Sequence, residues 1–435
     1  MANHGRRNFL KQTGAIAAAS TLAAARVGAA ANEEIRLACI GCGGRAQELL
    51  KSFSKMNGVQ VTTLCDVDDT KFENSFQSIE SVGGAKPRTE KDLRKVLDDK
   101  QIDGVIVATP DHWHAPAAIL ALDAGKHVYV EKPCGHNLRE GRLLTEAARR
   151  NNRIVQVGTQ SRSSPTIIKA MQLLREGAIG DILVAKAWNS QLRRSIGRGK
   201  TEPVPAGLDY DTWVGPAKFL PYQLNYVRYG WHWFYNFGTG DAGNDGVHDL
   251  DIARWGLGVD RHPNTISATG GKYFYDDDQE FPDTQYVSFE YRDPDGKHPK
   301  QLIYEHRIWS PYVQEGYENG NAYYGTKGML LLGKLGGWNL FGPRNKLIDS
   351  MAAGGMGEPH YRNFIDCVRS GQLPNADIEI GHYSAALSHL ANIATRLKTT
   401  LTFDPAAEKF VGNDEANALV SREYRTDHWA VPKGV

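Results

Sequence analysis

The stretch IRLACIGCGGRA, residues 35–46, decides the fold of this chain. Residues 35–40 are an almost continuous apolar run without helical periodicity, which predicts a strand buried on both faces. A glycine-rich turn follows directly, ahead of a segment of helical composition, and contains Gly41, Gly43 and Gly44. Such a turn lets the backbone approach a pyrophosphate and directs the amides of a helix N-terminus toward it. The stretch therefore predicts a dinucleotide-binding turn.

A carboxylate at the end of the next expected strand, residues 59–65, supports this prediction. Asp66 lies about 20 residues after the glycines, where its carboxylate can accept both ribose hydroxyls of an adenosine. The same charge repels a 2′-phosphate, so NAD is predicted in preference to NADP. Arg45 lies in the glycine turn and could reach a phosphate, which keeps NADP as the less favoured alternative.

The alternation of strands and helices continues beyond Asp66. Short apolar strands are expected at 104–108, 127–130 and 154–158, separated by helical segments of about a dozen residues. We therefore predict an α/β fold that begins with a Rossmann dinucleotide-binding domain over residues 32–160. Its ligand should lie beyond the carboxyl ends of the strands. The residues expected to bind the cofactor there, besides the glycine turn and Asp66, are Thr109, Pro110, His114, Glu131, Lys132 and Gln160.

Residues 161–435 are expected to form a second domain of the α+β class, for substrate binding and oligomerisation. Half-buried alternation in 284–293 and 300–309, joined by an Asp-Pro-Asp-Gly turn signal, predicts antiparallel strands. We expect one large, mostly antiparallel open sheet with helices on one face. The helical segments 361–369 and 383–397 are expected to pack back against the first domain.

Two motifs resemble those of a known family. Residues 108–133, ATPDHWHAPAAILALDAGKHVYVEKP, and residues 238–258, GTGDAGNDGVHDLDIARWGLG, resemble the Gfo/Idh/MocA oxidoreductases, which include glucose–fructose oxidoreductase and inositol dehydrogenases. The resemblance extends over nearly all of the mature chain. It implies that Lys132 lies beside the nicotinamide and the substrate hydroxyl, and that His248 completes the site. The family has an aspartate four residues before this histidine, whereas this chain has Asn244.

The residue types at this expected site suit the proton transfer that accompanies removal of a hydride from a secondary alcohol. Burial and a neighbouring cationic ring lower a lysine pKa, so Lys132 could act as a base, or as an ammonium that stabilises an alkoxide. His248 could shuttle the same proton, with Asp251 on its helical face to orient the ring. Asn244 can orient a hydroxyl but cannot take its proton. We therefore expect Lys132 and His248 to carry out the transfer of this proton.

An aromatic segment between these motifs, NYVRYGWHWFYNFGTG at 225–240, is expected to bind a sugar. Aromatic faces stack on the C–H edges of sugar rings while polar side chains meet the hydroxyls. The alternative is packing in the sheet or in a subunit interface. The residues expected to contact the substrate are Arg162, Tyr226, Arg228, Asn244, Asp245 and His248. A metal site at His232, His248 and Asp251 lacks close ligand spacing, so no metal is expected.

The first 31 residues are expected to be a twin-arginine signal peptide. Arg6 and Arg7 precede a weakly apolar, alanine-rich run, and small residues at 28–31 suit cleavage. The run is too short and too weakly apolar for a membrane span. We therefore expect export by the twin-arginine translocase to the periplasm, without a stable membrane span.

Composition and the expected export limit the classes of function that fit this chain. The chain has 51 Lys and Arg against 50 Asp and Glu, so nothing favours nucleic acid as a partner. We predict an NAD(P)-dependent oxidoreductase that acts on a secondary CH–OH group of a sugar, polyol or glycoside and recycles a tightly bound cofactor in place, as a homo-oligomer, dimer or tetramer. The alternatives are a redox-neutral NAD-dependent glycoside hydrolase or epimerase that works through a transient keto-sugar, and a non-catalytic sugar-binding protein with structural NAD.

Overall fold

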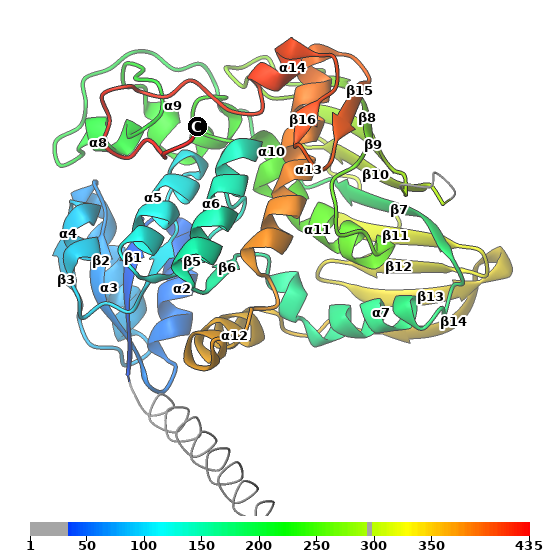
Figure 1. Ribbon diagram of the computed structural model, residues 1–435, viewed down its shortest axis with the longest axis horizontal. Coiled ribbons are helices and arrows are strands. Elements are labelled where there is room, and N and C mark those ends of the chain that lie inside the picture. Colours follow the sequence, from blue (N-terminus) through cyan, green and yellow to red (C-terminus); the bar gives the residue numbers. More distant parts are fainter. Residues whose placement is uncertain (1–33, 294–297) are drawn as a thin grey trace, which may run out of the picture.

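The computed structural model describes residues 34–293 and 298–435. The expected signal peptide and most of the expected turn at 293–296 lie outside these residues. The described chain forms two sheet-based parts side by side, with one long helix between them (Figure 1). The first part contains a six-stranded sheet and the second a ten-stranded sheet.

The first sheet has strand order β3-β2-β1-β4-β5-β6, and its strand pairs are parallel. Its strands are β1 (Ile35–Ile40), β2 (Val59–Cys65), β3 (Arg88–Glu90), β4 (Gly104–Val107), β5 (His127–Val130) and β6 (Val155–Val157). Its helices are α2 (Gly44–Ser54), α3 (Phe72–Glu80), α4 (Leu93–Asp98), α5 (Asp111–Asp123) and α6 (Leu138–Asn151). This order is that of the dinucleotide-binding Rossmann fold, and it confirms the prediction for the first part.

The second sheet is mixed but mostly antiparallel, with order β14-β13-β12-β11-β7-β10-β9-β8-β15-β16. Its strands are β7 (Ile182–Asn189), β8 (Thr265–Gly271), β9 (Thr284–Tyr291), β10 (Lys300–Arg307), β11 (Asn319–Gly325), β12 (Met329–Gly333), β13 (Gly337–Gly342), β14 (Lys346–Met351), β15 (Leu401–Asp404) and β16 (Lys409–Phe410). Only β7 and β10 pair in parallel. The antiparallel pair β9–β10 places Phe289 opposite Leu302, so the two expected strands pair as predicted. The α/β fold class is confirmed.

Helices fill the space between the two sheets. The helices on the second sheet are α7 (Pro165–Arg175), α11 (Gly246–Leu257) and α13 (Ile378–Leu397), and α13 also packs on α6 of the first part. α12 (Gly357–Ser370) contacts α2. Both C-terminal helices therefore return to the first part, as expected. The short helices are α8 (Tyr210–Val214), α9 (Leu224–Val227), α10 (Gly240–Asn244) and α14 (Asp414–Ala418).

The last residues of the chain also return to the first part, which the sequence did not predict. Arg422 donates to the backbone oxygen of His112 over 2.8 Å. The ring of Trp113 packs against His428 at 5.8 Å between centroids. Helix α5 is thus covered by the C-terminal segment, drawn in red across the top of Figure 1.

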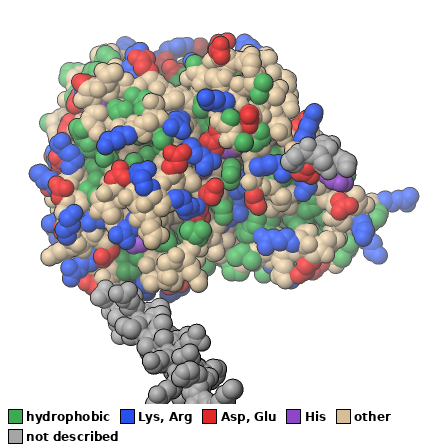
Figure 2. Space-filling view, viewed as in Figure 1, with side chains coloured by type: hydrophobic (Ala, Val, Ile, Leu, Met, Phe, Trp, Pro, Cys, Tyr) green, Lys and Arg blue, Asp and Glu red, His purple; other side chains and the backbone are tan. Residues whose placement is uncertain are grey.

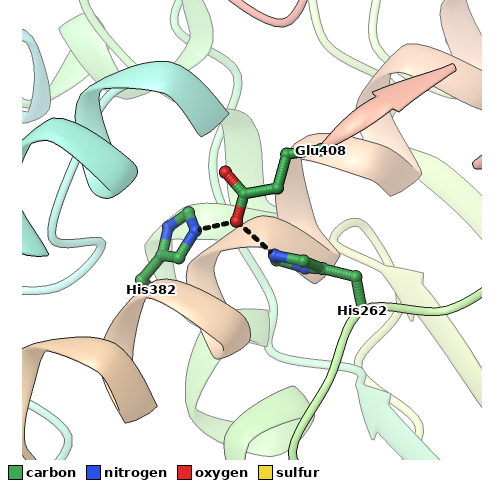
Figure 3. A group of neighbouring side chains, drawn as sticks. All are labelled: His262, His382 and Glu408. Carbon is green, nitrogen blue, oxygen red and sulfur yellow. Dashed lines mark hydrogen bonds and ion pairs between the residues drawn. The ribbon is translucent and has the colours of Figure 1, made fainter. Parts of the chain in front are cut away.

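The carboxylate of Glu408, between β15 and β16, contacts side chains of other elements (Figure 3). The Nε2 atoms of His262 and His382 each lie 2.8 Å from Oε1 of Glu408, and Arg142 donates to both oxygens of the same carboxylate. Burial lowers the pKa of His382 to about 4, so the ring is neutral at pH 7 and donates its Nε2–H. The three ligand atoms lie within 4.8 Å of one another, a spacing that could suit a metal ion. The Arg142 guanidinium, however, already supplies a positive charge at both oxygens.

The visible surface has basic and acidic side chains interspersed (Figure 2). Within 34–293 and 298–435, no helix combines the length and apolar character that crossing a membrane requires.

We expect Glu408→Gln to lower the free energy of unfolding by about 3 kcal/mol, the lower end for breaking a buried ion pair, because Arg142 is partly exposed. Guanidinium unfolding followed by circular dichroism measures this change. Glu146→Gln, on the exposed face of α6, is the matched control and should stay within about 0.5 kcal/mol of the wild type. Equal stability of the two variants would contradict a stabilising role for Glu408.

Candidate active site

A cleft of 690 Å³ lies at the carboxyl ends of β1, β2, β4 and β5. This is the edge of a Rossmann sheet at which ligands bind. All but one of the residues expected to bind cofactor line the cleft: Gly41, Gly43, Gly44, Arg45, Asp66, Thr109, Pro110, His114, Glu131 and Lys132. Gln160 is the exception, because its amide donates to the Tyr129 hydroxyl over 3.1 Å and it does not line the cleft.

The glycine turn fits a dinucleotide. Gly41 has φ +86°, and a Cβ there would lie 2.7 Å from the backbone of Ala108 and Thr109. At Gly43 and Gly44, which border the cleft, a Cβ would meet no protein atom within 4 Å. Both positions therefore leave free space at the N-terminus of α2, where phosphates bind. The Thr109 hydroxyl is buried without a partner in the described chain, as expected beside a ligand.

Asp66 lines the cleft directly after β2 and is held by the backbone. Its carboxylate accepts the backbone N–H of Cys42 over 2.6 Å and that of Asp68 over 2.9 Å. Arg45 is directed elsewhere, since its Nε donates to Glu131 over 2.7 Å and its Nη2 to the Tyr361 hydroxyl over 3.0 Å. The guanidinium is therefore committed to a buried carboxylate, an arrangement that suits NAD better than NADP.

His114 connects two loops of the cleft. Its Nδ1 lies 2.7 Å from the carbonyl oxygen of Pro133, and its Nε2 lies 2.8 Å from that of Thr109. Since both ring nitrogens face carbonyl oxygens, the imidazole holds the loop after β4 against the loop after β5. This fixes the loop that carries Lys132.

Lys132 crosses from the first part of the molecule to the second. Its Nζ donates to the backbone oxygen of Asn244, at the end of α10, and lies 3.4 Å from the Asn244 side-chain oxygen. Burial lowers the pKa of Lys132, while the carboxylates of Glu131 and Asp111 oppose this shift. The predicted pair, Lys132 and Asn244, therefore meets in the cleft.

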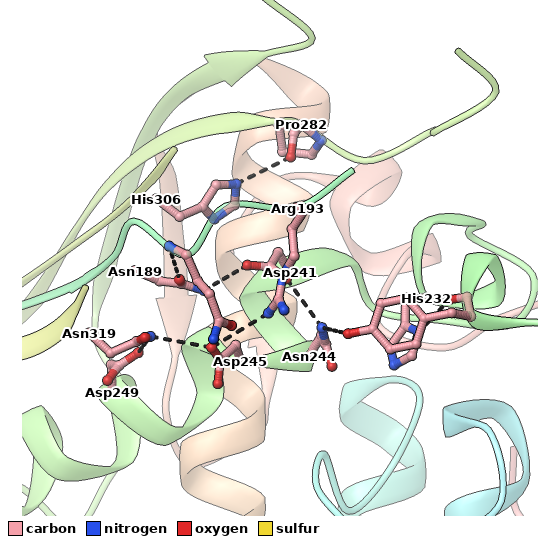
Figure 4. Close-up of polar contacts among 12 residues, drawn as sticks. Asn189, Arg193, His232, Asp241, Asn244, Asp245, Asp249, Pro282, His306 and Asn319 are labelled. Carbon is pink, nitrogen blue, oxygen red and sulfur yellow. Dashed lines mark hydrogen bonds and ion pairs between the residues drawn. The ribbon is translucent and has the colours of Figure 1, made fainter. Parts of the chain in front are cut away.

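Asn244 is held by a buried polar network (Figure 4). Its amide nitrogen lies 3.2 Å from Asp241 and 3.3 Å from the Tyr229 hydroxyl. Asp241 also accepts from Asn189 over 2.6 Å and from Arg193 over 3.0 Å. The orientation of Asn244 is thus set from the second sheet, because β7 carries Asn189.

Asp245 belongs to the same network rather than to the cleft. Its carboxylate accepts from Lys334 over 2.6 Å and lies 3.5 Å from Arg193. Burial alone would raise the pKa of Asp245, but the Lys334 ammonium keeps it well below its usual value. Burial raises the pKa of Asp249 to about 8, so this neighbour is mostly protonated at pH 7. Arg193 and Lys334 were not predicted from the sequence, because both lie far from the two motifs.

His248 lies in the first turn of α11, beside the cleft but not among the residues that line it. Burial lowers its pKa well below the usual value, and the ammonium groups of Lys334 and Lys132 lower it further. Asp251 does not orient this ring, in contrast to the expectation. Its carboxylate accepts from Arg162 over 2.8 Å and from Ser384 over 2.6 Å.

The expected substrate role of Arg162 also differs from what the structure shows. The side chain is buried in its ion pair with Asp251 and lies over the Trp255 ring, 4.6 Å from the centroid. A guanidinium committed in this way has little capacity left for sugar hydroxyls. Arg162 instead joins the loop after β6 to α11.

Part of the aromatic segment reaches the cleft. Arg228, Tyr229, Trp231 and His232 line it. Trp231 and His232 stack at 3.5 Å between ring centroids. The Nδ1 of His232 lies 2.7 Å from the Tyr229 carbonyl oxygen, and burial lowers the His232 pKa well below its usual value. Sequence analysis considered this histidine only as a metal ligand, although its neutral imidazole lies at the cleft. Tyr226 points elsewhere and packs on Phe234 at 4.6 Å.

Two family models match the chain. One, described as "Oxidoreductase family, NAD-binding Rossmann fold", matches residues 35–159. The other, described as "Oxidoreductase family, C-terminal alpha/beta domain", matches residues 188–297 and 344–431. The fold and the cleft thus match an oxidoreductase family whose first domain binds NAD. The chain belongs to the Gfo/Idh/MocA oxidoreductase family.

Curated relatives match only part of the chain. A "Glycosyl hydrolase family 109 protein" of Stenotrophomonas maltophilia is 31% identical over 216 residues, 47% of each chain. An "Alpha-N-acetylgalactosaminidase" of Shewanella oneidensis is 28% identical over 211 residues, 43% of this chain and 46% of that relative. The chain therefore spans less than half the length of these relatives.

Solved structures match over most of the chain. The WlbA dehydrogenase of Bordetella pertussis, in complex with NADH and UDP-GlcNAcA, has a TM-score of 0.64 at 18% identity and covers 86% of this chain and 99% of its own. The aldose-aldose oxidoreductase of Caulobacter crescentus has a TM-score of 0.65 at 16% identity, with 85% and 100% covered. At these identities the similarity shows a shared fold.

We expect Gly41→Ala to abolish stoichiometric NAD binding, because the new Cβ would collide with the backbone after β4 and displace the turn. Gly83→Ala is the matched control, since Gly83 has φ +79° but open space around a Cβ. The control should retain NAD and lose only about 1 kcal/mol of stability. Nucleotide released from each purified protein by denaturation, and counted per chain, measures the effect. Full occupancy in Gly41→Ala would contradict this assignment of the turn.

Proposed function

We propose that this protein is an NAD-dependent oxidoreductase that acts on a secondary CH–OH group of a sugar, polyol or glycoside, with a tightly held cofactor reduced and reoxidised in place. The observation that carries the proposal is the meeting of Lys132 with Asn244 at the cleft. It places a buried ammonium and an amide where the fold would hold the nicotinamide.

The cofactor, when bound, supplies the acceptor for a hydride. The chain supplies the proton chemistry. Lys132, whose pKa is lowered by burial, takes the hydroxyl proton or stabilises the alkoxide as an ammonium. Asn244 orients the hydroxyl, because Asp241 and Tyr229 hold its amide. His248 has a lowered pKa and is proposed to pass the proton on from the edge of the cleft.

The substrate class follows from the residues of the aromatic segment that line the cleft, here called the aromatic wall: Arg228, Tyr229, Trp231 and His232. Tyr229 and the stacked pair of Trp231 and His232 supply flat faces, and Arg228 supplies donors. Aromatic faces with a few polar groups suit a sugar ring. Since Asp66 is held by two backbone amides, we propose that it binds the adenosine ribose at the other end.

A second candidate function is a redox-neutral glycoside hydrolase or epimerase. The naming of curated relatives as glycosyl hydrolase family 109 proteins favours it. Transient oxidation of one ring carbon acidifies the neighbouring C–H, which permits elimination or epimerisation before the hydride returns. The same residues would serve both reactions. A non-catalytic protein with structural NAD would have no need of a buried lysine at the nicotinamide.

We expect sugars added to the purified holoprotein to change the near-ultraviolet absorbance of reduced nicotinamide. A lasting rise indicates oxidation, a rise that a second sugar reverses indicates paired transfer, and product without net reduction indicates the redox-neutral cycle. Lys132→Ala should retain NAD but lose at least about 100-fold in turnover, the lower range for general acid–base groups.

Lys169→Ala, an exposed residue of α7, is the control and should turn over at the wild-type rate. Silence of the wild type across a broad panel of saccharides and glycosides would favour the binding protein. Unchanged turnover in Lys132→Ala would remove this lysine from the mechanism.

We further propose export by the twin-arginine route, on the motif at Arg6 and Arg7. Arg6→Lys combined with Arg7→Lys should leave the protein in the cytoplasmic fraction, because the two cations differ in geometry and the signal is read by a receptor. Cell fractionation with immunoblotting measures this distribution, and Lys11→Gln, which keeps both arginines, is the control. Undiminished export of the double variant would overturn the proposed route.

A further inference from the structure

A second cavity, of 620 Å³, is lined by other residues of the aromatic segment, among them Phe234 and Tyr235. It is nearly as large as the cleft and falls within the 300–1,000 Å³ typical of ligand pockets. Five segments build it: the loop before α6, the chain from Lys218 to Thr239, the chain before β9, helix α13, and the end of α14 with the chain after it. Tyr226, expected at the substrate, lines this cavity instead.

Two buried side chains that line the cavity have polar atoms without partners in the described chain. Both ring nitrogens of His136 are unpaired, and the residue is 8% exposed. The Nε and Nη1 of Arg422 are also unpaired, whereas its Nη2 pairs with Glu140 over 2.7 Å. A buried donor left unsatisfied costs about 1–3 kcal/mol. His136 and Arg422 therefore make part of the cavity wall polar.

The charges around the cavity are balanced. Lys218 pairs with Glu423 over 3.0 Å, and the Arg422 charge is met by Glu140. Arg396 and Glu280 both line the cavity, and the positive charge of Arg396 favours the ionised form of the Glu280 carboxylate. An ion would thus gain no net attraction. A neutral molecule that both donates and accepts hydrogen bonds fits better.

Aromatic rings complete the lining. Tyr235 and Phe281 lie 4.4 Å apart between centroids, and the Arg396 guanidinium lies 4.4 Å over the Tyr235 ring. Phe234 lines the same cavity. Aromatic faces beside donors and acceptors of hydrogen bonds suit the C–H edges and hydroxyls of a sugar. We infer that this cavity is a second, non-catalytic binding site for a neutral saccharide.

The second site is connected to the catalytic one through Thr239. This residue lines the cavity, accepts from Asn392 through its backbone oxygen over 2.7 Å, and donates to Asp111 over 2.6 Å. Asp111 lines the catalytic cleft and acts on the charge of Lys132. The inference does not require turnover in the cleft, since it rests on the lining of the cavity alone.

Equilibrium dialysis of the holoprotein with radiolabelled cellobiose tests the inference. We expect binding in the second cavity that Arg396→Gln weakens at least about tenfold, a loss of 1.4 kcal/mol. Ser421→Trp, which fills the cavity, should abolish it, whereas Lys132→Ala should leave it intact. Arg175→Gln, on the exposed face of α7, is the matched control. A crystal soaked with cellobiose locates the bound sugar.

Cellobiose density confined to the catalytic cleft, or binding that neither cavity variant changes, would overturn the inference. Tighter binding of glucuronate or inorganic phosphate than of cellobiose would overturn the neutral class. If no saccharide is turned over but Ser421→Trp still removes bound cellobiose, the proposed function fails and the second site stands.

Discussion

The contact of Lys132 with Asn244 is the interaction on which the rest of the site depends. The lysine follows β5 of the first sheet, and the asparagine ends a short helix of the second part. Burying an ammonium costs several kcal/mol unless oxygen atoms replace its water. The carbonyl and amide oxygens of Asn244 supply that replacement, with Glu131 and Asp111 as nearby carboxylates. One buried cation thereby joins the first part of the molecule to the second.

The network behind Asn244 explains why this contact is rigid. Asp241 and Asp245 alternate with Arg193 and Lys334, so each buried charge faces an opposite one. Within the described residues Asp249 forms no ion pair, and burial favours its protonated form although the Lys334 charge opposes this shift. Charges paired in this way hold one geometry, since displacing any member would leave another unpaired in a medium of low dielectric constant. Support of this kind fixes the orientation of the Asn244 amide.

The cofactor end could be predicted because its signals are local. Gly41 lies three residues before the start of α2, and Asp66 follows the neighbouring strand of a parallel sheet. The network could not be predicted in the same way, since Lys334 lies 89 residues from the carboxylate that it meets. The partners of Arg162 and Gln160 were missed for the same reason. A side chain's type shows what it can bind, but its neighbours decide what it does bind.

The sequence by itself determined the alternation of buried strands and helices, the glycine turn, and the two motifs that bring a lysine and an asparagine to one site. These follow from backbone geometry and hydrophobic periodicity, which act over a few residues. Only the tertiary structure decided that Arg45 pairs with Glu131 and that Asp251 pairs with Arg162 rather than His248. It also decided that other residues of the aromatic segment line a second cavity. Those outcomes depend on which buried charges and rings meet after folding, and burial makes each choice of partner costly to change.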